Sequence, residues 1–207
     1  MPVLDLPNGY YELPAGKLAN VVTCLEMKAR PHRALQPFPE GLTLKRFQPG
    51  DLVGHRALFR DVGSDLMWFS RLIMKDEDLA AILANPAIES CALMQDGDML
   101  GMLELNFAEA GQCELAFYGL VPSAIGQGLG RALMDEAIRR AWARPINRFW
   151  VHTCTFDSPL ALPFYIRSGF TPYMRMVEVH DDPRLLGKLA ADASPQGMRA
   201  DLERLLK

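Results

Sequence analysis

A glycine-rich stretch in front of an amphipathic segment is the feature that most limits the fold of this chain. Residues 124–137 read AIGQGLGRALMDEA, with a glycine at every second position from 126 to 130. On a helical wheel, the residues after these glycines separate into an apolar face (Leu133, Met134, Ala137, Ile138, Ala141) and a charged face (Arg131, Asp135, Arg139, Arg140). The sequence therefore predicts a helix over about 127–143, with the glycines at its N-terminus.

The start of this predicted helix has the chemistry of an anion-binding site. Several backbone N–H groups there lack a helical partner, and the helix dipole favours negative charge. Glycines let an anion come close to these donors, so the stretch predicts a loop that holds a diphosphate. A plain strand-to-helix turn is the alternative. Two common phosphate-binding patterns are excluded: a P-loop requires Lys and then Ser or Thr after Gly130, and a dinucleotide-binding turn requires glycine where Arg131 stands.

Hydrophobic periodicity and turn residues predict the elements on either side of this helix. Strands are expected at 20–29, 42–48, 88–95, 99–107, 113–121, 148–154 and 171–180, and helices at 51–61, 66–84 and 158–168. Consecutive strands followed by alternating helices and strands predict an α/β (α+β) fold with a mixed, mostly antiparallel sheet and helices on both faces.

The length of 207 residues fits one domain over 1–207. Its core is expected over about 42–180, with an N-terminal extension over 1–41 that carries an extra strand. The tail over 181–207 is expected to be helical, most clearly in SPQGMRADLERLLK.

Charge and composition exclude several classes of partner. The net charge of −3 gives no overall attraction to nucleic acid or to anionic lipid. There is no run of about 18 apolar residues that would span a membrane. The N-terminal residues lack the pattern of a secretory signal, so we expect a cytoplasmic protein. The four cysteines are scattered without a C-x-x-C pair, which predicts free thiols and no metal site.

Two motifs resemble the GNAT superfamily of acyl-CoA-dependent N-acetyltransferases. IGQGLG is similar to that family's Q/R-x-x-G-x-G/A motif, in the context FYGLVPSAIGQGLGRALM of strand, loop and helix. SPLALPFYIRSGF resembles a later signature, A-x-x-F/L-Y-x-x-x-G-F, with its positions filled by Ala161, Phe164, Tyr165, Gly169 and Phe170. The two motifs stand at the separation, and in the elements, that the resemblance requires.

The resemblance implies acetyl-CoA as the acyl-donor cosubstrate, held mainly by backbone groups. The pantetheine arm is expected between the strands 113–121 and 148–154, bonded to the backbone at Leu120 and Val121. The diphosphate is expected at Ile125, Gly126, Gln127, Gly128, Leu129, Gly130 and Arg131. Ile125 departs from the family's Gln or Arg, so no polar side chain contributes there. Asp157 or Ser158 is expected to cap the helix that follows, with a polar contact from Ser158 to the cofactor as the alternative.

The reaction implied is direct attack of an amine on the thioester within a ternary complex. An alkyl amine with a pKa of about 10.4 is neutral in only about one molecule in two thousand at pH 7, a handicap of about 4–5 kcal/mol that makes a general base worthwhile. Glu114 is the candidate base, eleven residues before Ile125, at the offset of the catalytic glutamate in the histone-acetyltransferase branch. His152 is the rival base. Tyr165 matches the tyrosine that protonates the departing thiolate.

The acceptor is expected to be a small amine or an exposed amino group of a protein. In this family the acceptor pocket is formed largely near the first helices, where LMWFSRL (66–72) offers Trp68, Phe69 and Arg71, although core packing of the aromatic pair is the alternative. The extra N-terminal strand has three open roles: extending the sheet, covering the cleft, or forming the edge of a homodimer. The alternative function is a non-catalytic acyl-CoA-binding sensor or scaffold.

Overall fold

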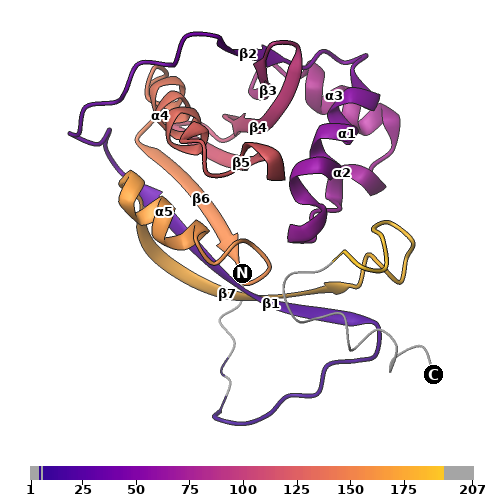
Figure 1. Ribbon diagram of the computed structural model, residues 1–207. Helices are drawn as coiled ribbons and strands as arrows, with labels where there is room; N and C mark the ends of the chain where they lie inside the picture. Colours follow the sequence, from indigo (N-terminus) through magenta and orange to yellow (C-terminus); the bar gives the residue numbers. More distant parts are fainter. Residues whose placement is uncertain (1–4, 6, 194–207) are drawn as a thin grey trace.

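A seven-stranded sheet runs through the molecule in the order β2-β3-β4-β5-β6-β1-β7 (Figure 1). The computed structural model describes residue 5 and residues 7–193. The strands are β1 (Lys17–Met27), β2 (Leu42–Arg46), β3 (Ile88–Gln95), β4 (Asp98–Asn106), β5 (Gln112–Leu120), β6 (Arg148–Cys154) and β7 (Thr171–Asp181). All of the pairings between them are antiparallel except that of β5 with β6. The predicted fold class is therefore confirmed, and so is the predicted order of the strands along the chain.

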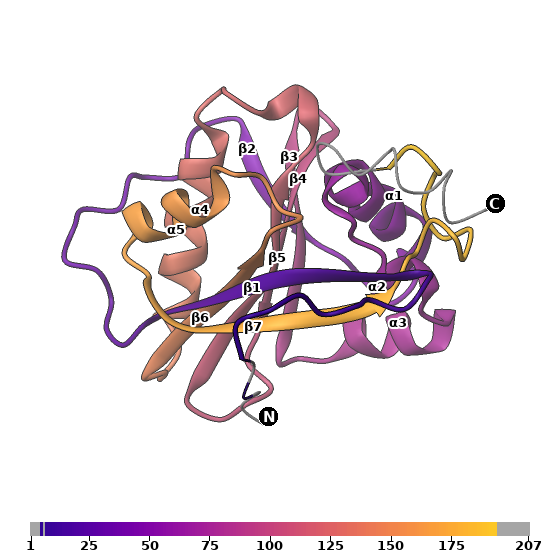
Figure 2. The same cartoon turned by 90° about the horizontal axis from the view of Figure 1, so that it is seen from below.

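Helices cover both faces of this sheet, as the sequence predicts. They are α1 (Leu52–Gly63), α2 (Ser70–Ile73), α3 (Asp76–Ala84), α4 (Leu129–Ala141) and α5 (Ala161–Ser168). Figures 1 and 2 show α4 and α5 on one face and α1, α2 and α3 on the other. Side chains alternate along β4, so that Leu103 and Leu105 pack with the core under α4 while Met102 packs with the core under α1 and α3. The apolar face predicted for α4 is fully buried in the first of these cores.

The N-terminal strand β1 lies inside the sheet, between β6 and β7, and is antiparallel to both. Cys24 stands opposite His152 of β6, and Asn20 stands opposite Glu178 of β7. The sequence left open three roles for this strand. One of them, the edge of a homodimer, is wrong, because β2 and β7 form the two edges of the sheet. The strand is therefore a central part of the fold rather than an addition to its outside.

The helix predicted over 66–84 is wrong as a single element. In the structure this region holds the turn η1 (Ser64–Leu66), then α2 and then α3. Met67 has a left-handed backbone with φ of 60°, and Met74 is extended, and each of these conformations interrupts a helix. The indole of Trp68 occupies the space beside Gly63, where it leaves no room for a Cβ. The same indole packs against the ring of Phe117 in β5, with ring centroids 5.2 Å apart, and this long-range contact overrides the local helical pattern.

One residue on the charged face predicted for α4 is buried. Asp135 is fully buried and accepts hydrogen bonds from the Arg33 guanidinium and, over 2.9 Å, from the backbone N–H of Gln36. Burial opposes ionisation, but these donors and the charge of Arg33 lower the pKa of Asp135. The connector between β1 and β2 therefore lies against α4, which periodicity within α4 does not reveal.

The C-terminal tail is helical in the prediction, but residues 182–193 form turns. The segment SPQGMRADLERLLK lies outside the described residues. Over the described part of the chain, the four cysteines are free thiols, three of them buried and Cys154 partly buried. None of the helices among residues 5 and 7–193 has the length and apolar character needed to cross a bilayer.

Candidate active site

The parallel strands β5 and β6 separate partway along their length. They pair only where Gln112 to Glu114 stand beside Arg148 to Trp150, although β5 continues to Leu120 and β6 to Cys154. A cavity of about 880 Å³ opens beyond the last pair and is lined by both strands, by the 64–71 segment and by α5. The backbone of β5 beyond Glu114 is bonded to β4 on one side only, so its other edge faces this cavity.

A β-bulge in β5 decides which side chains reach the cavity. Glu104 of β4 stands opposite Phe117, and Leu105 stands opposite Leu115, so Ala116 is an extra residue in β5. In a regular strand without this bulge, Glu114 and Phe117 would lie on opposite faces, because they are three positions apart. With it, both lie on the face of the sheet toward α1.

At one side of the cavity, the start of α4 forms a surface that we call the glycine rim (residues 125–131). Gly128 is the N-cap of α4 with φ of 79°, and Gly126 has φ of 86°. No atom lies within 4 Å of the place where a Cβ would stand at either position. The backbone N–H groups of residues 126–130 donate no hydrogen bond to any described residue. No acidic side chain occupies the first turn of the helix.

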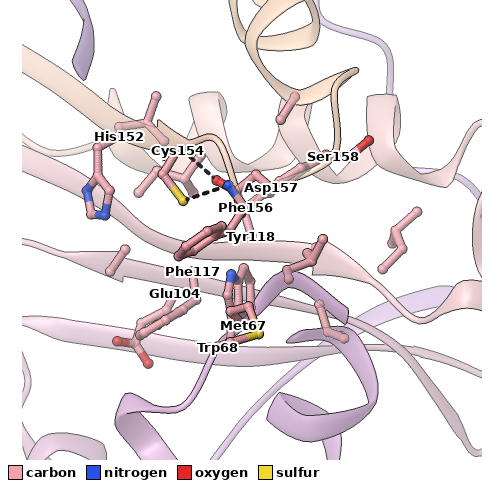
Figure 3. A pocket seen from close by; sticks show the side chains of 18 of the residues that line it. Met67, Trp68, Glu104, Phe117, Tyr118, His152, Cys154, Phe156, Asp157 and Ser158 are labelled. Atoms are coloured by element: carbon pink, nitrogen blue, oxygen red, sulfur yellow. Dashed lines mark hydrogen bonds between the residues drawn. The ribbon is translucent and has the colours of Figure 1, made fainter. Parts of the chain in front are cut away.

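The predicted cofactor residues divide into two groups. Leu120, Ile125, Gly130 and Ser158 line the cavity. Val121, Gly126, Gln127, Gly128, Leu129 and Arg131 do not line it and lie at the surface beside it. The side chain of Tyr118, a residue of β5, reaches the rim, where its hydroxyl donates to the carbonyl of Gly130. Figure 3 shows Ser158 at one side of the cavity and Glu104 and His152 at the other.

The helix cap predicted at Asp157 or Ser158 is wrong. The N-cap of α5 is Leu160, which makes no side-chain capping bond. Asp157 instead binds back to the end of β6, where its Oδ2 accepts from the Thr153 hydroxyl over 2.7 Å and from the Cys154 N–H over 2.9 Å. Ser158 Oγ accepts from the N–H of Leu160 over 3.3 Å, within the loop. Asp157 therefore fixes the turn that leaves β6.

Tyr165 lines the cavity from α5 and is 7% exposed. Burial, with a smaller effect of the negative charge of Asp157, raises the pKa of its hydroxyl. The phenol therefore keeps its proton at neutral pH. Its ring lies 6.2 Å from that of Tyr118 in an edge-on arrangement.

Glu114 stands at the last position where β5 pairs with β6, and it lines the cavity. The Asn106 amide donates to its Oε2 over 3.3 Å. Burial raises the pKa of Glu114, and the neighbouring His152 and Asn106 offset part of that rise. His152 also lines the cavity but is exposed, so both candidate bases from the sequence meet in one place.

The predicted acceptor residues Trp68, Phe69 and Arg71 all line the cavity. Trp68 also packs against the rings of Phe59 and Phe117, so the packing and lining roles coexist. Arg71 donates to Glu104 Oε1 over 2.6 Å, and its guanidinium lies 5.0 Å from the centre of the Phe117 ring. Burial disfavours the charge on Glu104, but the nearby His55, whose Nε2 lies 3.9 Å from Glu104 Oε2, and the charge and hydrogen bond of Arg71 lower its pKa overall.

The cavity is also lined by polar residues that sequence reasoning did not single out, among them Asn20, Glu104 and Glu178. With Glu114 and His152, these three residues form what we call the carboxylate wall, on the face of the sheet toward α1. A signal existed for Glu104, because it interrupts the apolar strand run MLELNF. No local signal marks Asn20 or Glu178, because they come together only through the pairing of β1 with β7.

Comparisons with known proteins show which family the sequence matches. Residues 50–170 match the acetyltransferase (GNAT) family. A mycothiol acetyltransferase from Beutenbergia cavernae is 36% identical over 77 residues, which are 37% of this chain and 26% of that protein. The chain thus spans about a quarter of this curated relative.

Solved structures share the fold at low sequence identity. A GCN5-related N-acetyltransferase from Sphaerobacter thermophilus is 16% identical with a TM-score of 0.56, over 79% of this chain and 52% of that one. One from Kribbella flavida is 18% identical with a TM-score of 0.55, over 83% and 63%. An aminoglycoside acetyltransferase from an uncultured soil sample, solved with sisomicin, is 16% identical with a TM-score of 0.52, over 62% and 88%. Since the family match covers more than half of its residues, this chain belongs to the GNAT acetyltransferase family.

Proposed function

We propose that the protein transfers an acetyl group from acetyl-CoA to an amine by direct attack in a ternary complex. The observation that carries this proposal is the cavity between β5 and β6, which Glu114 and Tyr165 line and which reaches the glycine rim at Ile125 and Gly130. The family membership and the partial match to a mycothiol acetyltransferase support acetyl transfer in general. The acceptor is a small amine or an exposed amino group of a protein.

The residues at the glycine rim fit a diphosphate. Open space above Gly126 and Gly128, free N–H donors and the positive end of the helix dipole suit an anion. Ile125 is 65% exposed and stands where the family has Gln or Arg. The site therefore lacks a polar side chain there but keeps all of these backbone donors. The unpaired edge of β5 from Leu115 to Leu120 would bond the pantetheine arm as a further strand. Acetyl-CoA, when bound, supplies the acyl group as a reactive thioester.

Glu114 serves as the general base in this proposal. Its carboxylate accepts a proton from the acceptor ammonium, which leaves the neutral nitrogen able to attack. The raised pKa of Glu114 suits this role, because a base works best when its pKa lies nearer the working pH. His152, exposed and within electrostatic reach of Glu114, is the rival base.

Tyr165 serves as the general acid. Its hydroxyl donates a proton to the departing thiolate sulfur, and burial keeps that hydroxyl protonated until then. A thiol with a pKa of about 8.5 leaves readily without help, so this contribution is modest.

A thiol-release assay tests the proposal. Purified protein with acetyl-CoA and a panel of amines should release free thiol and form an acetylated amine identified by mass spectrometry. Glu114→Gln should slow release strongly, and His152→Asn should slow it little, each with unchanged affinity for CoA. If His152→Asn has the larger effect, the two roles are exchanged.

The second candidate is a non-catalytic acyl-CoA-binding module, favoured by the absence of a polar side chain at Ile125. It predicts tight acetyl-CoA binding by calorimetry, no acetylated product from any amine, and no effect of Glu114→Gln. Location in the cytoplasm and a homodimer stay predictions, which fractionation and light scattering would test.

A further inference from the structure

The carboxylate wall is rich in hydrogen-bond acceptors. Glu104, Glu114 and Glu178 reach the cavity from three different strands. The cationic side chains in the lining are Arg71 and Arg167. Arg71 is already paired with Glu104 over 2.6 Å, and Arg167 is an exposed residue of α5. The charge that remains on the wall is therefore negative, at Glu114 and Glu178, and it favours a ligand with more than one cationic group.

Asn20 provides a second and independent observation. Its side chain is 3% exposed and lines the cavity. Its Nδ2 donates to Glu178 Oε2 over 2.9 Å, and this bond fixes the orientation of the amide because a carboxylate only accepts. The remaining atom, Oδ1, is buried and has no hydrogen-bond partner among the described residues. A buried polar atom without a partner costs free energy, so this oxygen is suited to receive a donor from a ligand.

Aromatic rings line the same cavity as Asn20. His180 follows Glu178 on the same face of β7, and its ring lies 5.2 Å from Phe69 and 6.0 Å from Phe156. All three side chains line the cavity. An aliphatic chain can pack against such rings while its terminal nitrogen reaches Asn20 and Glu178.

Resting on the proposed function, we propose that the acceptor is a small molecule with two amino groups joined by an aliphatic segment. One amino group lies at Glu114 and is acetylated. The second stays protonated and donates to Asn20 Oδ1 and to the carboxylate of Glu178. The N-terminal strand β1 thereby supplies a specificity residue for the acceptor.

Matched amine pairs test this inference. Rates are measured for a series of α,ω-diaminoalkanes and for the monoamines with the same number of carbons. We expect kcat/KM for the best diamine to exceed that of its monoamine by about tenfold or more, the usual scale for a hydrogen bond to a charged group. Glu178→Gln and Asn20→Ala should raise KM for the diamine by about tenfold, with little change in kcat or in the monoamine rates.

Two controls separate binding from structural damage. Glu40→Gln makes the same chemical change as Glu178→Gln at an exposed residue of the connector and should change neither substrate class. Because Asn20 is buried and its replacement carries a risk of misfolding, the exposed Glu178 gives the decisive variant. Binding of the diamine to the protein with CoA present is measured by calorimetry alongside the rates.

The outcomes distinguish this inference from the proposed function. Equal rates for diamines and monoamines, or a preference for lysine peptides, would overturn the inference and leave acetyl transfer intact. Diamine binding that weakens in Glu178→Gln, with no acetylation of any amine, would support the diamine site at Asn20 and Glu178 and overturn the proposed function. Absence of both diamine binding and turnover would overturn both.

Discussion

The glycine rim and the carboxylate wall bound the same cavity but are built in opposite ways. The rim consists of backbone donors from one continuous stretch, residues 125–131, at the start of a single helix. The wall consists of side-chain acceptors that come from β1, β4, β5, β6 and β7. A site made from one local stretch can be recognised by its motif, whereas a site assembled from five strands depends on how the whole sheet is ordered.

The largest effect is expected where the wall carries a buried charge pair. Glu104→Gln leaves Arg71 buried beside a neutral partner, and loss of one member of such a pair costs about 3–5 kcal/mol. Urea unfolding at neutral pH should show a loss on this scale, and Glu40→Gln, at an exposed site, should show none. If Glu104→Gln is as stable as the wild type, the wall is not organised by this pair.

The Arg71–Glu104 pair also determines in which direction the free energy of unfolding changes with pH. The pKa of Glu104 is lowered in the folded state, so its stabilising contribution is complete above the unfolded pKa of about 4.3 and is lost as pH falls through the folded pKa. The difference in unfolding free energy between wild type and Glu104→Gln should therefore narrow in acid. A difference that widens as pH falls would contradict this assignment.

The next effect in size tests the catalytic part of the wall. Glu114→Gln should lower kcat by about 10²–10³-fold, the usual contribution of a general base, without weakening CoA binding. Because burial raises the pKa of Glu114, the acid limb of kcat/KM in the wild type should lie above the ordinary glutamate value of about 4.3. This limb is measured from rates at several pH values, after correction for protonation of the amine. It should be absent in Glu114→Gln.

A smaller effect, on the Kd for CoA, is expected from a glycine substitution at the rim, which has a matched control. Gly128→Ala and Gly97→Ala both place a side chain at positive φ in open space, at a strain of about 1–2 kcal/mol. Only Gly128→Ala adds a methyl group at the predicted diphosphate site, so only this variant should raise the Kd for CoA, by about tenfold, as measured by calorimetry. Equal Kd values for CoA in the two variants would contradict the proposal that the diphosphate binds at the glycine rim.

The smallest effect is expected at Tyr165. Tyr165→Phe should lower kcat by about tenfold or less, because a thiol with a pKa of about 8.5 leaves without much assistance. Stopped-flow detection of free thiol measures the rate, and circular dichroism checks that the packing around the ring is retained. A loss as large as that in Glu114→Gln would make the tyrosine, rather than the glutamate, the main catalytic group.

Local signals predicted the rim and much of the fold. The amphipathic pattern placed α4 correctly, and Gly169 ends α5 with φ of 113°, as a C-terminal glycine commonly does. The strands and their order follow from alternation and turn residues, which act within a few positions of the chain. The two motifs that carry the family resemblance lie in these locally specified parts.

Long-range packing explains what the sequence did not predict. The break near Met67 depends on Trp68 packing against Phe117 of β5, and the burial of Asp135 depends on a connector about 100 positions away. The wall depends on β1 pairing with β6 and β7. Asn20 carries no local sign of this, since an asparagine in a strand-like run is compatible with an exposed position as well as a buried one.

The position of β1 inside the sheet, between β6 and β7, has a consequence for how the protein folds. During synthesis β1 leaves the ribosome before the other strands, yet its neighbours β6 and β7 are more than 120 positions further along. Closing so long a loop is entropically costly and slows folding. The sheet therefore stays divided until β6 and β7 have emerged, and the newly made chain acquires the Asn20–Glu178 contact only in the last stage of its folding.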